Sequence, residues 1–583
     1  MNTKGLAAAF SFLVLWLGLA LACNLPQKSR LPAFQATALE ATRRAQLALP
    51  HPTLPIAQSS DGEGDPPHPT LAISADGEGD PAHPTLAISA DGEGNPTPAV
   101  ILTASPYPLN GLQTATAGPA PEAAQPTIAE TPDPDAPPLA FIYWTQPGDT
   151  LPALLARFDV LPGQVALLNA PAGASLPAEA FLPPGLSLSI VNNSGDRRGG
   201  DHPGLTGLPA YPSALLPDSA VVNSPAAAHF QTAAFIQQAG GFLSAYDEEL
   251  ESGEWMNGAE IVQRVALETS TNPQLLLTFL EYRSHWVLGQ PADPSQTDYP
   301  IGFYVPGYRG LYKELSLTAK QLNIGYYGWR EGSVLSLQFP DETRLRLAPG
   351  LNAGSVALEF LASKFYRLEA WQNALFGPQS IPLLYAQLFG DPWPAAPLLP
   401  PDLAQPVLEL PFAPGSPWSL TAGPHLAWNT GTPRGALDFA PITGEPACAV
   451  SNAWVTASAA GVVARSERGV LVLDLDGDGL EQTGWVLMYL HLAEKDRPAV
   501  GTAVQQDDRL GHPSCEGGQA TGTHVHLARK YNGEWLAADG PLPFVLSGWA
   551  AHAGEGAYDG TLEKDSQIVS ARPDGSHGST ITR

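Results

Sequence analysis

The chain has 583 residues, including 60 prolines and 57 glycines, and carries a formal net charge of −28. This length is enough for several domains, and the many prolines and glycines predict long loops and linkers between them. The negative charge argues against nucleic acid as a partner, because phosphates would be repelled over most of the surface.

The first residues are typical of a segment that directs export. A short basic start (1–4) precedes an apolar stretch (5–22), and Cys23 follows. This pattern resembles the signal of bacterial lipoproteins, and the resemblance implies that residues 1–23 are a signal peptide with a lipidated Cys23. An uncleaved transmembrane anchor is the alternative, because an apolar stretch of this length just suffices to span a membrane. Both interpretations predict an extracytoplasmic chain that is anchored to the membrane. The length of the segment that follows (24–139) suits a tethered protein that works in the cell wall outside that membrane.

Residues 24–139 carry a repeat but no sign of a core. His-Pro-Thr-Leu begins at positions 51, 68 and 83, and Asp-Gly-Glu-Gly begins at positions 61, 76 and 91. The copies have neither helical nor alternating apolar periodicity, so they offer no face that could stack. We therefore predict a disordered acidic linker, with metal binding by its histidines and carboxylates as a weaker alternative.

Residues 140–191 change in character and predict a small βααβ module. Its expected elements are a strand at 141–144, a helix after 147–151, a second helix over 160–169 and a closing strand at 184–190. Asp149 or Thr150 can cap the first helix by accepting hydrogen bonds from its free N–H groups.

The run from Gln146 to Leu151, together with Asn169 and the later Pro184-Gly185, resembles the lysin-motif (LysM) domain. The resemblance implies that the module binds glycans containing N-acetylglucosamine, such as peptidoglycan, through its two loops. The residues expected to contact the glycan are Gly148, Asp149, Thr150, Pro184 and Gly185. A structural module without a ligand is the alternative.

Residues 192–224 are rich in glycine, proline and serine and predict a linker, after which residues 225–395 predict an α-helical domain. Asn257 and Glu260 fit a capping box at the start of one helix. Asn272 followed by proline fits the start of the next helix.

The run that begins at Asn272 weakly resembles a helix of lysozyme-like transglycosylases, in which the acid glutamate directly precedes a serine. Here Arg283 stands before Ser284, and an arginine cannot donate a proton at neutral pH. We therefore expect a non-catalytic domain of degenerate lysozyme-like type, with a second active site on Glu281 as the weaker alternative.

A proline-rich linker (396–414) leads to the last domain (415–550), in which short apolar segments between turns predict an antiparallel β fold. Residues 551–583 are rich in Gly, Ser and Asp and predict a disordered tail. Cys448 and Cys515 both lie in the last domain. In an exported protein they predict a disulfide, with buried free thiols as the alternative.

Five side chains of this domain form a candidate metal site. His524 and His526 project from the same face of an expected strand, because side chains alternate along a strand. His425, Asp438 and His491 precede them in the chain. Two imidazoles and a carboxylate make a three-ligand zinc set whose fourth position stays open for water, as a catalytic zinc requires.

The contexts Gly423-Pro424-His425 and Leu437-Asp438-Phe439, with their spacing, resemble the lysostaphin/β-lytic family of zinc metallopeptidases, which cut peptides in bacterial peptidoglycan. The resemblance implies that His425, Asp438 and His526 bind zinc and that His491 and His524 form a catalytic pair. One of this pair would remove a proton from water, and the other would stabilise the oxyanion.

Two other groups offer alternative ligands. His512 could bind the metal, although a loop histidine beside Cys515 is more often structural. Asp474, Asp476 and Asp478 look like half of a calcium loop, but Trp485 stands where such a loop has its last glutamate. We therefore expect this segment to be the turn of a hairpin.

These features together predict a membrane-anchored zinc endopeptidase of peptidoglycan, concentrated on its substrate by the LysM module. The alternative belongs to another class: a non-catalytic, peptidoglycan-binding lipoprotein that recruits or activates a separate hydrolase. Proteins of that kind typically lose zinc ligands, whereas this chain keeps the full set.

Overall fold

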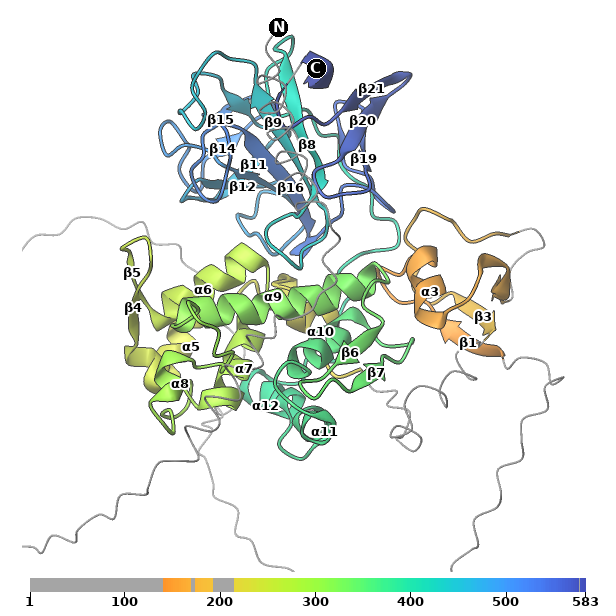
Figure 1. Cartoon of the computed structure of the whole chain (residues 1–583), viewed down its shortest axis with the longest axis vertical. Helices are drawn as coiled ribbons and strands as arrows, with labels where there is room; N and C mark the ends of the chain where they lie inside the picture. The colour runs from red at the N-terminus through yellow and green to blue at the C-terminus, as the bar shows by residue number, and fades with distance from the viewer. Residues whose placement is uncertain (1–139, 169–173, 192–213, 576) are drawn as a thin grey trace, which may run out of the picture. The chain divides into compact units, whose positions relative to one another are not determined.

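The computed structural model describes residues 140–168, 174–191, 214–575 and 577–583 (Figure 1). The predicted signal peptide, its Cys23 and the repeat segment lie outside the described residues. Among the residues that are described, no helix is both long enough and apolar enough to cross a membrane.

The first described region is a small module built on a three-stranded antiparallel sheet in the order β1-β3-β2. Its elements are β1 (Ala140–Trp144), α3 (Leu151–Phe158), η1 (Pro162–Gln164), β2 (Val165–Leu167) and β3 (Ser187–Val191). The Thr150 hydroxyl caps α3 as predicted. The predicted second helix is wrong. Residues 162–164 make a single 3-10 turn, and Val165 then pairs with Ile190, because a β-branched residue fits a sheet.

Residues 214–389 form a mainly helical region with two short hairpins. Its helices are α4 (Asp218–Val221), η3 (Pro225–Ala227), α5 (Thr232–Ala239), η4 (Phe242–Ala245), α6 (Gly258–Thr269), α7 (Pro273–Ser284), α8 (Ser295–Asp298), α9 (Leu311–Arg330), α10 (Ala353–Ala362), α11 (Leu368–Phe376) and α12 (Ile381–Phe389). The hairpins pair β4 (Asp247–Glu249) with β5 (Trp255–Asn257) and β6 (Ser336–Gln338) with β7 (Arg344–Arg346). Helix α9 packs against α6 and α10 (Figure 1). Helix α4 lies inside the predicted linker 192–224, so the ordered region begins earlier than predicted.

Side chains at the helix ends explain where two of these helices begin and one ends. Asn257 and Glu260 form the predicted capping box of α6, and Asn272 caps α7. The carboxylate of Glu281 accepts hydrogen bonds from the N–H groups of Val287 and Leu288, both at 2.9 Å. Glu281 therefore stabilises the turn after α7, which gives it a structural role.

The last region is an antiparallel β fold, as predicted. Its elements are β8 (Trp418–His425), β9 (Ala436–Pro441), β10 (Val455–Thr456), β11 (Gly461–Glu467), β12 (Val470–Asp474), β13 (Trp485–Leu490), β14 (Ala503–Val504), β15 (Arg509–Gly511), β16 (Val525–Tyr531), β17 (Glu534–Trp535), β18 (Val545–Leu546), β19 (Trp549–Ala553), β20 (Gly560–Lys564), β21 (Gln567–Ser570), η5 (His577–Ser579) and β22 (Thr580–Ile581). A nine-stranded sheet runs in the order β14-β11-β12-β13-β16-β9-β8-β22, with β17 paired to β16. A four-stranded sheet follows the order β18-β19-β20-β21.

The two faces of the large sheet are buried in two different cores. Leu437, Leu487 and Leu527 point into a core that lies within the β region. Ala436 and Ala528, on the opposite face, belong to the same core as the helices. Side chains two residues apart on a strand share a face, so Asp438 and His526 lie on the face that the helical core also contacts.

The turn between β16 and β17 is fixed to the helical region by buried polar contacts. Glu534 accepts hydrogen bonds from Tyr326 (2.9 Å) and Arg330 (3.0 Å), and Ser270 donates one to the carbonyl of Gly533 (2.6 Å). Gly533 has a φ of +78°, and a Cβ atom there would lie 2.1 Å from the carbonyl oxygen of Asn223. The close approach of the two backbones therefore requires glycine at this turn.

Two segments that we expected to be unstructured contribute to the β core. The predicted linker 396–414 supplies the buried side chains Leu408, Leu410 and Phe412. The predicted disordered tail 551–583 forms β20, β21 and β22, and Leu562 and Ile581 from it are buried. Each of these strands has only one or two apolar residues, too few to show an alternating pattern in the sequence.

Candidate metal centre

Three neighbouring strands bring the predicted metal ligands together. His425 ends β8, Asp438 lies within β9, and His526 is the second residue of β16. Asp438 pairs directly with His526 in the sheet, whereas a register shift in β8 separates Ala422, opposite Asp438, from His425. The irregular end of β8 thus turns the His425 ring toward the other two side chains.

The potential metal-ligand atoms of these three residues lie close enough together to share one ion. His425 Nε2 is 3.0 Å from His526 Nδ1 and 3.2 Å from Asp438 Oδ1, and His526 Nδ1 is 3.2 Å from the same oxygen. All three side chains are buried. Asp438 Oδ1 has no hydrogen-bond donor among the described residues, so a buried carboxylate oxygen is left without a partner there. Two nitrogens and one such oxygen fit zinc.

Backbone carbonyls fix the orientation of both ligand rings. His425 Nδ1 donates a hydrogen bond to the carbonyl of Gly423 (2.9 Å), and His526 Nε2 donates one to the carbonyl of Ala427 (3.0 Å). Each ring therefore holds its proton on the outer nitrogen and presents a lone pair at the inner nitrogen, as a metal ligand must. Burial would raise the pKa of the Asp438 carboxyl, but the positive charge that His425 and His526 carry when protonated outweighs burial and holds this pKa far below its usual value.

The two remaining histidines lie beside this set and are held in the same way. His491 directly follows β13, and His524 directly precedes β16. His491 Nδ1 donates to the carbonyl of Glu516 (2.8 Å), and His524 Nδ1 donates to that of Gly522 (2.7 Å). Their ring centroids are 4.5 Å apart, and His524 Nε2 is 3.5 Å from Asp438 Oδ2. Burial and then the neighbouring His524 lower the pKa of His491 to about 4.

Tyr558 is a residue of the site that the sequence analysis missed. Its ring stacks on His425 with centroids 4.7 Å apart, and its side chain is 53% exposed. It lies between β19 and β20, in the segment that we predicted to be disordered, and its carbonyl accepts a hydrogen bond from Gly423 N (2.8 Å). One aromatic residue among glycines gave no signal that it would contact a ligand.

The predicted disulfide is present, and His512 lies outside the triad. Cys448 and Cys515 are bonded. The ring of His512 contacts Trp454, and its Nδ1 donates to the carbonyl of Ala453 (2.9 Å), so it is not part of the triad. Asp474 is the last residue of β12, and the segment after it leads to β13, which confirms the hairpin turn. In this turn one carboxylate oxygen each from Asp474, Asp476 and Asp478 lies within 4.8 Å of the others, close enough to share a cation.

The predicted glycan-binding residues of the first module fall into two groups. The buried carboxylate of Asp149 accepts hydrogen bonds from the Tyr143 hydroxyl and the Arg157 guanidinium, both at 2.7 Å. The Thr150 side chain caps α3. Pro147, beside Gly148, accepts a hydrogen bond from Arg330 of α9. The first loop is thus engaged within the protein.

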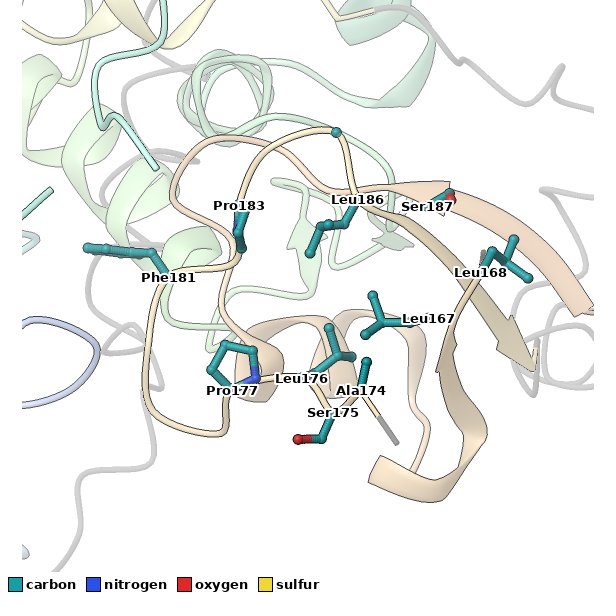
Figure 2. Close-up of a pocket in the computed structure, with 11 residues that line it drawn as sticks. Leu167, Leu168, Ala174, Ser175, Leu176, Pro177, Phe181, Pro183, Leu186 and Ser187 are labelled. Carbon is teal, nitrogen blue, oxygen red and sulfur yellow. The ribbon is translucent and has the colours of Figure 1, made fainter. Parts of the chain in front are cut away.

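The second loop borders a cavity of about 580 Å³. Gly185 lines it beside Pro183, and Pro184 lies between them. Figure 2 shows that most of the other side chains around it are apolar, including Leu176 and Phe181. Of the two predicted loops, the one at 183–185 therefore has space beside it for a ligand.

Comparisons with known proteins find a family model and several relatives that match this chain. Residues 214–402 match the family model of the LasA N-terminal domain. This match does not support our lysozyme-like interpretation of the helical region. The chain is 29% identical over 296 residues to protease LasA of Pseudomonas aeruginosa, which covers 46% of this chain and 65% of that protein.

Two further relatives are named metallopeptidases. The β-lytic metalloendopeptidase of Achromobacter lyticus is 30% identical over 161 residues, covering 26% of this chain and 40% of that protein. The one from Lysobacter enzymogenes is 28% identical over 155 residues, covering 26% of this chain and 83% of that protein. These names agree with the prediction of a metallopeptidase.

Among solved structures, the M23 metalloprotease pseudoalterin aligns with 31% of this chain and 100% of its own, at 22% identity and a TM-score of 0.25. The catalytic domain of lysostaphin from Staphylococcus simulans aligns with 21% of this chain and 87% of its own, at 22% identity and a TM-score of 0.15.

Proposed function

We propose that this protein is an exported zinc metalloendopeptidase that hydrolyses peptide bonds in peptidoglycan. The observation that carries the proposal is the convergence of His425 Nε2, Asp438 Oδ1 and His526 Nδ1 within 3.2 Å of one another, with His491 and His524 beside them. The names of the protease relatives support the same reaction class.

His425, Asp438 and His526 would hold the zinc, which supplies a Lewis acid that lowers the pKa of bound water toward about 7. The protein supplies the proton transfers. Because the Nδ1–H groups of His491 and His524 are donated to carbonyls, Nε2 is the nitrogen of each ring that is left for proton transfer. One Nε2 accepts a proton from the attacking water and passes it to the amine nitrogen as the peptide C–N bond breaks. The other Nε2, when protonated, donates a hydrogen bond to the developing oxyanion.

The proposed substrate is a peptide of the cell wall, and the first module is the proposed glycan-binding part. The cavity beside Pro183 and Gly185 supports this role, because sugar rings are commonly held against apolar and aromatic side chains. The proposed membrane anchor is a lipid on Cys23. Cys23→Ser should then move the protein from the membrane fraction to the soluble extracytoplasmic fraction.

The test of function is digestion of purified peptidoglycan by the full-length chain, with mass analysis of the released fragments. We expect peptide-bond products from the wild type and none from His526→Ala. A wild type that binds the wall but releases nothing, as His526→Ala does, would instead favour a binding protein that recruits another hydrolase.

Glycan binding has a separate test at the cavity. Phe181→Ala should reduce sedimentation with peptidoglycan several-fold without changing turnover of a short soluble peptide. Leu161→Ala, at a residue that is 71% exposed and does not line the cavity, is the matched control. Equal losses in both assays, or no loss of binding, would contradict a glycan site there.

A further inference from the structure

His491 has an unusual backbone for a histidine. It directly follows β13 and has a φ of +67°, in the left-handed region that residues with a Cβ atom rarely adopt. Such a conformation persists only where the surroundings impose it, and it is often found at functional sites. The contacts of the His491 carbonyl show what imposes it.

Both donors of Ser514 hold this carbonyl. The backbone N–H of Ser514 lies 2.7 Å from the His491 oxygen, and the Ser514 hydroxyl lies 3.0 Å from it. The same hydroxyl accepts a hydrogen bond from the N–H of Glu516 (3.0 Å). The carbonyl of Glu516 in turn accepts the Nδ1–H of the His491 ring (2.8 Å). One serine therefore connects the backbone and the ring of His491 in a closed circuit of hydrogen bonds.

Ser514 also lies opposite the second histidine of the pair. Ser514 and His524 form an antiparallel β-bridge, in which the N–H of His524 approaches the carbonyl of Ser514 at 3.5 Å. Next to Ser514, Cys515 is fixed by its disulfide to Cys448. Ser514 is itself 1% exposed, so substrate does not reach its hydroxyl.

We infer that Ser514 is a positioning residue, which holds His491 in its left-handed conformation and in the Nδ1–H tautomer and sets its separation from His524. This inference rests on the proposed function, because it gives the histidine pair its catalytic meaning. The disulfide holds the segment that carries the serine. Ser514 acts through His491 and contacts neither the metal ligands nor the reacting atoms.

The test compares Ser514→Ala with Ser419→Ala in the full-length protein. Ser419 is a buried serine of β8 whose hydroxyl donates to the carbonyl of Gly575 (3.0 Å), so both variants lose a buried hydroxyl. We expect Ser514→Ala to keep its zinc and its KM while kcat falls roughly tenfold, the effect of losing about two hydrogen bonds. Ser419→Ala should keep kcat, and Ser514→Thr, which retains a hydroxyl, should restore most of it.

A second readout does not depend on activity. In protein labelled with ¹⁵N-histidine, the ring nitrogens of His491, assigned with His491→Gln, should report the Nδ1–H tautomer in the wild type and a mixture in Ser514→Ala. An unchanged tautomer together with an unchanged kcat would overturn the inference. A wild type without hydrolysis would refute the proposed function, whereas the tautomer comparison would still decide the role of Ser514.

If Ser514→Ala does not fold, Ser514→Gly, which also removes the hydroxyl, takes its place in both measurements. A lower kcat at constant KM with mixed tautomers supports the inference. A His491 signal and a kcat like those of the wild type overturn it.

Discussion

Asp438 and His526 face each other across the paired strands β9 and β16, with Oδ1 and Nδ1 3.2 Å apart. Asp438 supplies the carboxylate of the triad, and a neutral amide is a much weaker ligand. Mutation of a residue that only hydrogen-bonds to a metal ligand typically lowers metal affinity roughly 10–100-fold. We therefore expect Asp438→Asn, which changes a ligand itself, to lower zinc affinity by more than this. Zinc content after dialysis against a chelator measures this change.

The matched control for metal loss is His512→Ala. His512 is another buried histidine of the same domain, but its ring contacts Trp454 and the carbonyl of Ala453. This variant should keep its zinc. Metal lost from His512→Ala but kept by Asp438→Asn would show that the triad is assigned wrongly.

Removing His491 should separate catalysis from metal binding. We expect His491→Ala to retain zinc while the rate of peptide release falls roughly 10²–10⁴-fold, the usual contribution of a positioned acid or base. His552→Ala, at a histidine that is 46% exposed in its side chain, should leave the rate unchanged. Loss of zinc from His491→Ala would make this residue a ligand and not a member of the catalytic pair.

The C-terminal strands should be needed for stability. Leu562 in β20 is fully buried in the β core, so Leu562→Ala should lower the free energy of unfolding by about 2–5 kcal/mol. Ile568 in β21 is 63% exposed, so Ile568→Ala should change it by less than about 0.5 kcal/mol. Urea unfolding measures both. Equal and small effects would mean that this segment is dispensable.

Acid should destabilise the protein through Glu481. Burial raises the pKa of this carboxyl, but Arg465 (2.5 Å) and Lys530 (3.0 Å) outweigh it and lower the pKa to about 2. Because the folded pKa lies below the ordinary value of about 4.5, this contribution to stability is complete above pH 4.5. It is lost as the pH falls toward 2.

Glu481→Gln should remove this part of the acid dependence. It also leaves Arg465 and Lys530 buried without a counter-charge, so stability at pH 7 should fall by about 3–5 kcal/mol. Glu467→Gln is the control, because Glu467 forms a half-exposed pair with Arg468 and should cost less than about 1 kcal/mol. Unfolding curves between pH 2 and pH 7 test both, and an acid dependence of Glu481→Gln equal to the wild type would contradict this role.

More of the candidate site than of the fold could be predicted from the sequence. The resemblance of the contexts around His425 and Asp438 to a zinc peptidase family selected His425, Asp438 and His526, and the structure brings the side chains of these three residues together. Tyr558 could not be found in this way, because backbone hydrogen bonds to a segment distant in the chain, at Gly423 and Pro424, bring it to His425. Ser514 was missed for a different reason, because a single buried serine has no distinctive spacing in a sequence.

Local sequence signals predicted the starts of helices well. They predicted the pairing of strands poorly. The capping box of Asn257 was predicted correctly because it depends on four consecutive residues. The second helix at 160–169 was wrong because Val165 joins β3, a contact that helical periodicity does not reveal. The strands after residue 551 were missed because each is stabilised by a partner strand and not by its own composition.

The account depends most on a single zinc bound by three named side chains. A crystal structure of the full-length protein, with anomalous data at the zinc edge, tests this directly. We predict one zinc at about 2.0–2.2 Å from His425 Nε2, from Asp438 Oδ1 and from His526 Nδ1, with His491 and His524 not coordinated. Zinc at other residues, or a fourth protein ligand that closes the site, would contradict it.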